Sequence, residues 1–117
     1  PSLPQTAGFI GERQFRAMRP TAYLINTARG PLVDEDALVR ALQKKQIAGA
    51  ALDVFDGEPR ADSPFANFTN VIVSPHIAVA TVESMAKMGE SAVDNAIAVV
   101  SGRWPRDIVV NGVYQEN

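Results

Sequence analysis

The sequence predicts an α/β fold in which three parallel strands, with flanking helices, form part of a doubly wound sheet. Three short apolar runs, at residues 22–27, 48–54 and 71–74, are typical of buried parallel strands. A segment with helical periodicity separates the first two runs, and another follows the third. This alternation favours an α/β architecture over an all-helical or all-β one.

The first part of the chain is expected to hold a loop at residues 1–11, a short helix at residues 12–18 and one longer helix. Asp34 is the expected N-cap of the longer helix, and acids follow it where the helix dipole favours them. Its apolar residues obey the i, i+3, i+4 rule, and two lysines are expected in its last turn: Ala37, Leu38, Ala41, Leu42, Lys44 and Lys45.

Two loops and a long helix are expected in the second part. Residues 55–70 form a loop rich in Pro, Asp and Gly, and residues 75–80 form another. Thr81 is the expected cap of a helix that runs to about Ser101, and Gly102 stops it. The tail contains an extended run at residues 108–110. The helix carries an apolar stripe of Met85, Met88, Ala92, Val93, Ala96, Ile97 and Val100.

Composition excludes several classes of protein. The net charge is −2 without a basic stripe, so nucleic acids and anionic membranes are not expected partners. The absence of cysteine excludes disulfides and a cysteine nucleophile, and with one histidine no metal site is expected. No apolar run reaches the roughly 18 residues of a membrane span, and a cytoplasmic location is expected. Because the chain begins with Pro1 rather than Met, we expect a segment of a longer protein.

Polar side chains follow the ends of the predicted strands. Arg29 comes after the first strand, Asp53 closes the second, Glu58 lies in the loop beyond it, and His76 comes after the third. Ligands of open parallel sheets bind outside the carboxyl ends of the strands. These residues are therefore predicted to converge on one edge.

Each of these residues can also be interpreted without a functional site. Arg29 fits a surface arginine, Glu58 a solvated loop acid and His76 an ordinary loop residue. Asp53 lies in an apolar strand and needs a partner there, so it could cap a nearby backbone amide. Together these residues indicate a functional site more strongly than any one of them does, because all of them are predicted at one edge of one sheet.

Three segments closely resemble the signatures of the D-isomer-specific 2-hydroxyacid dehydrogenases, in order and in approximate spacing. They are residues 26–30 (Asn-Thr-Ala-Arg-Gly), residues 51–55 (Ala-Leu-Asp-Val-Phe) with Glu58-Pro59, and residues 74–78 (Ser-Pro-His-Ile-Ala). The resemblance extends from Pro1 to about Asn111 and implies a Rossmann-like fold. It further implies that residues 1–101 are the C-terminal part of a dinucleotide-binding domain. Residues 102–117 would be an extended tail returning toward a substrate domain.

The resemblance implies catalytic roles for Arg29, Glu58 and His76. Arg29 would hold the substrate carboxylate and polarise the 2-oxo group, a task suited to a planar guanidinium. His76 would be the general acid in reduction and the base in oxidation, paired with Glu58.

The resemblance also implies NAD or NADP as cofactor. Asp53 would accept a hydrogen bond from the nicotinamide carboxamide. The other positions assigned to cofactor contact are Thr6, Thr27, Ala28, Arg29, His76, Ala78 and Val79. Val79 stands where the family usually has Gly, and a β-branched residue disfavours the positive φ that Gly adopts.

The implied activity is hydride transfer between the cofactor and a small 2-oxo or 2-hydroxy acid, such as glyoxylate, hydroxypyruvate or phosphohydroxypyruvate, in a homodimer. An NAD(H)-sensing corepressor of the same fold, without turnover, and phosphite oxidation stay open. Relatives that oxidise formate carry Gln where Glu58 stands, which argues against that reaction. No glycine-rich dinucleotide fingerprint occurs in the chain, so the 117 residues alone are expected to bind NAD weakly and to transfer no hydride.

Overall fold

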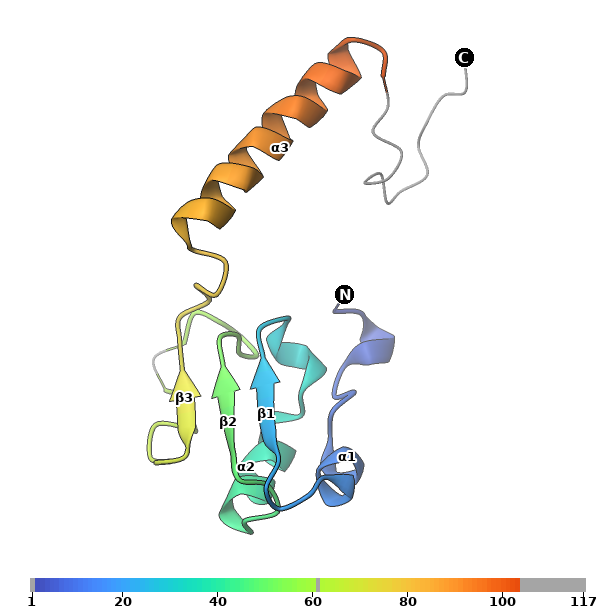
Figure 1. Ribbon diagram of the computed structural model, residues 1–117. Helices are drawn as coiled ribbons and strands as arrows, with labels where there is room; N and C mark the ends of the chain where they lie inside the picture. Colours follow the sequence, from blue (N-terminus) through green and yellow to red (C-terminus); the bar gives the residue numbers. More distant parts are fainter. Residues whose placement is uncertain (1, 61, 104–117) are drawn as a thin grey trace. The chain divides into compact units, whose positions relative to one another are not determined.

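The computed structural model describes residues 2–60 and 62–103 of the chain (Figure 1). These residues belong to two compact units, residues 1–78 and residues 79–117, called here the first and the second unit. Each unit is described by itself.

The first unit is built on a parallel sheet, as predicted. Its strands lie in the order β1-β2-β3, and Ile25, Ala51 and Ile72 occupy equivalent positions across them. The elements of this unit, in chain order, are the 3₁₀ turn η1 (Pro4–Thr6), α1 (Glu12–Ala17), β1 (Tyr23–Asn26), the 3₁₀ turn η2 (Gly30–Leu32), α2 (Glu35–Gln43), β2 (Gly49–Leu52) and β3 (Val71–Val73).

The structure differs from the predicted elements mainly at their ends. The region predicted as a plain loop at residues 1–11 contains η1, and all three strands are shorter than the apolar runs that predicted them. The two lysines predicted in the last turn of α2 lie just beyond it. Lys44 is the C-cap, and Lys45 has a φ of 53°. A left-handed residue at this position reverses the chain and ends the helix.

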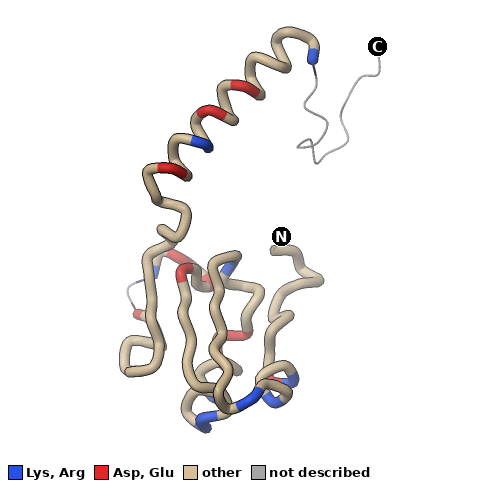
Figure 2. Tube along the Cα trace, viewed as in Figure 1, with Lys and Arg blue, Asp and Glu red and all other residues tan. Residues whose placement is uncertain are grey.

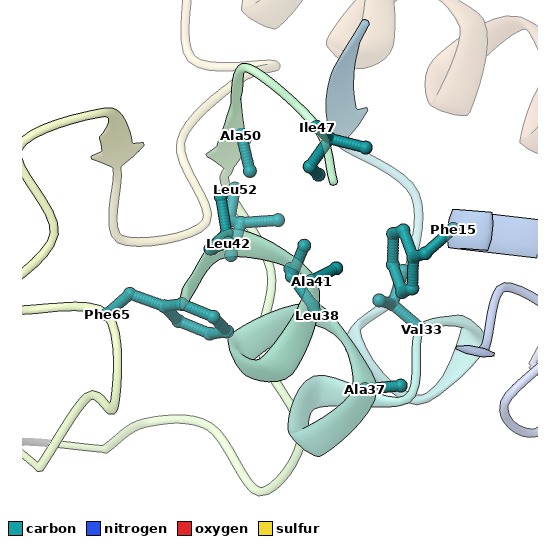
Figure 3. Close-up of a cluster of buried hydrophobic side chains, with 10 residues drawn as sticks. All are labelled: Phe15, Val33, Ala37, Leu38, Ala41, Leu42, Ile47, Ala50, Leu52 and Phe65. Atoms are coloured by element: carbon teal, nitrogen blue, oxygen red, sulfur yellow. The ribbon is translucent and has the colours of Figure 1, made fainter. Parts of the chain in front are cut away.

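The core of the first unit lies between α2 and one face of the sheet (Figure 3). The predicted N-cap begins α2, since the Asp34 carboxylate accepts a hydrogen bond of 2.9 Å from the Ala37 amide. Leu38 on α2 is fully buried, and burying such a side chain stabilises a fold by about 1.5–3 kcal/mol. The predicted apolar face of α2 packs against side chains from α1, β2 and the loops. The cluster they form together consists of Phe15, Val33, Ala37, Leu38, Ala41, Leu42, Ile47, Ala50, Leu52 and Phe65.

The opposite face of the sheet is exposed. Tyr23, Ile25 and Ile72 are 66%, 71% and 74% exposed, respectively. The prediction of fully buried strands is therefore wrong for this face. Side chains of a strand alternate between the two faces of its sheet, and in the described first unit the core covers only one of them.

The second unit contains α3 (Val82–Val100). The predicted cap is present, because the Thr81 hydroxyl oxygen accepts a hydrogen bond of 3.1 Å from the Ser84 amide. The helix ends before Gly102, which has a φ of 72°. None of its described side chains is buried, and its predicted stripe includes the exposed Met85 and Met88. No helix among the described residues has the length and apolar character needed to cross a membrane. The extended run predicted at residues 108–110 lies outside the described residues.

Candidate functional site

The carboxyl ends of the three parallel strands lie at one edge of the first unit (Figure 1). Arg29 follows β1, Asp53 follows β2, and His76 follows β3, with Glu58 in the loop that leaves β2. Parallel topology thus brings segments separated by more than twenty residues to the same edge, as predicted.

His76 and Glu58 are in contact at this edge. His76 Nδ1 lies 3.0 Å from Glu58 Oε1, and the two side chains are 47% and 27% exposed. They border a hollow of about 460 Å³, whose lining also includes polar and apolar side chains from their two loops and from the end of β3. We call these two residues the His76–Glu58 pair. The other residues of this hollow are Phe55, Pro59, Arg60, Ser63, Val73, Ser74 and Pro75.

The backbone at His76 is in the left-handed region, with a φ of 55°. Few residues other than Gly adopt this conformation, although His is enriched among those that do. The His76 amide donates hydrogen bonds to the carbonyl oxygens of Asp53, at 2.8 Å, and Ser74, at 3.1 Å. These bonds hold the sharp turn that presents the imidazole at the edge.

Asp53 organises the loop that carries His76. Its carboxylate is buried, and it accepts hydrogen bonds from Ser74 Oγ at 2.6 Å, from the Ile77 amide at 2.9 Å and from the Ala78 amide at 2.8 Å. The Ser74 hydroxyl, followed by the two amides and the nearby His76, holds the pKa of Asp53 below its usual value, although burial opposes this. The interpretation of Asp53 as a cap for backbone amides is therefore confirmed.

Arg29 lies at the same edge without touching the His76–Glu58 pair among the described contacts. Its guanidinium is exposed, and Nη1 donates a hydrogen bond of 2.6 Å to the Ala28 carbonyl oxygen. The segment is fixed by Asn26, which is only 6% exposed. Asn26 Nδ2 donates to the Arg29 carbonyl at 3.0 Å, and Asn26 Oδ1 accepts from the Ala28 amide at 3.1 Å. This positioning role of Asn26 was not predicted.

Gly30 joins the Arg29 segment to the loop that carries Glu58. A Cβ atom at Gly30 would lie 2.0 Å from the carbonyl carbon of Phe55 and 2.5 Å from the Asp56 nitrogen, which is too close for any side chain. The glycine of the motif at residues 26–30 is therefore required by a close backbone approach, which its presence in the sequence alone did not reveal.

The remaining candidate cofactor residues are placed as follows. Thr27 and Ala28 follow β1, and Ala78 ends the first unit. The Thr6 hydroxyl exchanges hydrogen bonds with the Leu3 backbone in η1. Val79 belongs to the second unit, and it is not among the residues with positive φ. The backbone therefore accommodates Val79 without the conformation that would favour Gly.

Charges in the first unit are unevenly distributed (Figure 2). Basic residues gather at the end where α1 and the C-terminal end of α2 lie, whereas acidic residues are prominent toward the carboxyl ends of the strands. Within the described parts of the chain, no group of three or more His, Asp or Glu side chains could hold a metal ion. The side chains that this edge presents include the His76–Glu58 pair and the exposed guanidinium of Arg29.

Comparison with known sequences gives relatives across most of the chain. A sequence model described as "D-isomer specific 2-hydroxyacid dehydrogenase, NAD binding domain" matches residues 1–78. A glyoxylate reductase of Thermofilum pendens is 51% identical over 110 residues, which are 93% of this chain and 32% of that protein. Glyoxylate/hydroxypyruvate reductase B of Shigella boydii is 44% identical over 110 residues, or 93% of this chain and 34% of that protein. The chain thus spans about a third of the length of these relatives.

Solved structures show the same fold. A D-isomer specific 2-hydroxyacid dehydrogenase of Lactobacillus delbrueckii ssp. bulgaricus, in its NAD complex, has a TM-score of 0.81 and 37% identity, covering 94% of this chain and 38% of its own. An NADPH-dependent glyoxylate/hydroxypyruvate reductase of Sinorhizobium meliloti, in complex with NADP and malonate, has a TM-score of 0.77 and 42% identity, covering 86% and 32%. The parallel sheet therefore matches a Rossmann-like NAD-binding domain, and the chain belongs to the D-isomer specific 2-hydroxyacid dehydrogenase family.

Proposed function

We propose that the whole protein is an NAD(P)-dependent dehydrogenase that transfers hydride between its cofactor and a small 2-oxo or 2-hydroxy acid of the glyoxylate or hydroxypyruvate type. The observation that carries the proposal is the 3.0 Å contact between His76 Nδ1 and Glu58 Oε1 at the carboxyl edge of the sheet. The substrate class is supported by the names of the similar reductases. Activity is proposed for the whole protein, because the chain spans about a third of its relatives.

His76 is the proposed general acid. Reduction of a carbonyl requires a proton on its oxygen as hydride reaches its carbon, and a positioned imidazole can deliver that proton. Glu58 lies at Nδ1, so Nε2 is the nitrogen left for the substrate oxygen. The carboxylate orients the ring and balances the charge of the protonated imidazole. In the oxidation direction, the neutral ring accepts the proton from the 2-hydroxyl group.

Arg29 is the proposed substrate anchor. Its exposed guanidinium uses one donor on the Ala28 carbonyl, among the described contacts, and a guanidinium has five N–H donors. The remaining donors can form paired hydrogen bonds with the carboxylate of a 2-oxo acid. Asn26 and Gly30 fix the backbone on both sides of this residue, so the side chain starts from a defined position.

Asp53 fits a role in holding the nicotinamide carboxamide. Oδ1 accepts two hydrogen bonds, whereas Oδ2 accepts one, from the Ala78 amide. A carboxylate oxygen accepts about two, so Oδ2 retains capacity for a carboxamide N–H. NAD or NADP, when bound, supplies or accepts the hydride. Thr6, Thr27, Ala28, Ala78 and Val79 stay proposed cofactor contacts on the strength of the family resemblance.

The test uses the whole enzyme with NADH or NADPH and a panel of glyoxylate, hydroxypyruvate and 3-phosphohydroxypyruvate. His76→Ala is expected to lower kcat by roughly 10²–10⁴-fold, the usual contribution of a general acid. Arg29→Ala is expected to raise KM mainly. A fully active His76→Ala enzyme would contradict the mechanism. NADH binding without turnover of any 2-oxo acid would favour an NAD(H)-sensing binding protein instead.

A homodimer in the cytoplasm is also proposed, from the family resemblance. The exposed apolar side chains of α3, such as Met85 and Met88, are compatible with a subunit contact. Light scattering of the purified whole protein should give twice the mass of one chain, and a monomeric mass would contradict the dimer.

A further inference from the structure

Glu35, the first residue of α2, spans the gap between this helix and the loop that carries Glu58. Glu35 Oε1 accepts a hydrogen bond of 2.9 Å from the Asp56 amide, and Oε2 accepts one of 2.7 Å from Arg60 Nη1. The two donors lie two residues before and two residues after Glu58 in the sequence. One carboxylate therefore holds both sides of the residue that contacts His76.

An acidic residue in the first turn of a helix is ordinarily favoured by the helix dipole, but the dipole does not account for the contacts of Glu35. Asp36 occupies the same turn and is exposed, and among the described residues its side chain makes no hydrogen bond. The Glu35 side chain is only 15% exposed, and it reaches donors 21 and 25 residues away. A charged side chain buried to this extent is costly unless its hydrogen bonds are satisfied, and here both oxygens are used.

The loop needs such a restraint. Among its described residues, 55–60 and 62–70, the loop has no helix or strand, and Gly57, next to Glu58, has a φ of 69°. An irregular loop of this length can adopt many conformations, yet Glu58 must keep its carboxylate at His76 Nδ1. The rigid start of α2, fixed by its Asp34 cap, supplies the anchor.

We infer that Glu35 is a positioning residue that holds the Glu58 carboxylate against His76. The inference rests on the proposed function, in which the His76–Glu58 pair delivers the proton. Among the described interactions, the Glu35 side chain forms no hydrogen bond or ion pair with either member of the pair. Its effect runs through the backbone at Asp56 and the guanidinium of Arg60.

The tautomer of neutral His76 reports this positioning directly. A carboxylate at Nδ1 keeps the proton on Nδ1, whereas a histidine in water carries it mainly on Nε2. In the whole protein labelled with ¹⁵N-histidine, the signals of His76 are identified as those that disappear in His76→Gln. The wild-type chain should show the Nδ1–H form, and Glu35→Gln should shift the population toward Nε2–H.

Asp36→Asn is the matched control, because it removes one exposed negative charge from the same helix turn. It should leave the His76 signals unchanged. A folded Glu35→Gln chain with wild-type His76 signals would overturn the inference. A general loss of structure is recognised from the amide spectrum of β2 residues, and a second variant then decides the question.

That second variant is Arg60→Gln, which breaks the Arg60–Glu35 ion pair from the loop side. Arg60→Gln should shift the tautomer population of His76 toward Nε2–H, as Glu35→Gln does. Arg60→Lys keeps the positive charge and should leave the population as in the wild type. Arg60 Nε also lies 3.6 Å from the exposed Asp62, so Asp62→Asn is included and should have no effect. An unchanged tautomer in Arg60→Gln would overturn the inference.

Kinetics of the whole enzyme separate this inference from the proposed function. Glu58→Gln tests the proposed function. Undiminished turnover by that variant would refute the proposed function, and the NMR result would still decide whether Glu35 positions Glu58. If Glu58→Gln is slow, Glu35→Gln should lower kcat by up to about 100-fold and displace the pH–rate profile as Glu58→Gln does, with KM little changed. Wild-type kcat in Glu35→Gln would refute the inference alone.

Discussion

The backbones of Asp53 and His76 are joined by a hydrogen bond of 2.8 Å from the His76 amide to the Asp53 carbonyl. The carboxylate of the same aspartate accepts from the amides of Ile77 and Ala78. Asp53 therefore binds the chain at His76 and at the two residues that follow it. The stability of this turn should depend on the charge state of Asp53.

Asp53→Asn is expected to lose stability by an amount that depends on pH. The folded-state pKa of Asp53 is lowered, first by Ser74, so the ionised carboxylate contributes stability that is fully present above the usual value of 3.8. That contribution is lost as the pH falls through the lowered folded-state pKa. Urea unfolding between neutral pH and about pH 3 should show the difference between wild type and variant shrinking only below about 3.8.

Asp94→Asn serves as the control for this measurement, since Asp94 is exposed and lies within α3, away from both ends of the helix. It should stay close to wild type over the whole range. A difference between wild type and Asp53→Asn that stays constant into strong acid would show that the charge of Asp53 is not what holds the turn.

Ser74→Ala should raise the pKa of Asp53. The Ser74 hydroxyl donates to Asp53 Oδ1 at 2.6 Å and is the largest cause of the lowered pKa. The carboxyl ¹³C shift of Asp53, followed through an acid titration, measures the change. Ser91→Ala, which removes a hydroxyl from α3, is the control. If Ser74→Ala leaves the titration of Asp53 where it was, the hydroxyl does not stabilise the carboxylate.

His76→Gly should be more stable than His76→Ala by about 1 kcal/mol. The φ of His76 is 55°, and a Cβ atom is penalised in this left-handed region, whereas Gly is not. Thermal unfolding of both variants gives the difference. The opposite order is expected at Ala78, which lacks a positive φ, where Ala78→Gly should cost stability. Equal stabilities of the two His76 variants would mean that this turn relaxes once the imidazole is removed.

Periodicity and order in the sequence were enough to predict the sheet edge. The apolar runs correctly predicted the positions of three parallel strands. The parallel topology then predicted that His76 and Glu58 lie at one edge, where the structure has them in contact. The Asp34 cap was predictable because N-capping is local: acceptor and donor are three residues apart. These features depend on neighbours in the chain or on the general rule for parallel sheets.

Contacts between distant loops could not be predicted in this way. Glu35 carries the same local signal as Asp36, and only the folded chain shows that it binds Asp56 and Arg60. The exposed sheet face of Tyr23 and Ile25 was missed for a related reason. Apolar strands indicate burial, but their sequence does not state which chain segment covers each face.

Gly30→Ala should destabilise the first unit by about 1–3 kcal/mol or more, the range for overpacking a tight contact. The added Cβ atom would lie 2.0 Å from the Phe55 carbonyl carbon, and because the nearest atoms are backbone, no side-chain rotation relieves the clash. The Arg29 segment and the loop before Glu58 must then separate. Amide hydrogen exchange of β2 residues measures the stability of the unit, and the His76 ¹⁵N signals report the loop.

Gly89→Ala separates this steric effect from the general effect of adding a methyl group. Apart from the neighbouring backbone of α3 itself, a Cβ atom at Gly89 meets no atom within 4 Å, and Ala is the better helix former, so this variant should leave the first unit unchanged. Gly30→Ala should both lower the exchange protection of β2 and move the His76 signals, because the same contact holds the sheet edge and the Glu58 loop. If exchange protection falls while the His76 signals stay unchanged, only the Arg29 segment moves to relieve the clash. The Arg29 segment and the Glu58 loop would then be held in place independently.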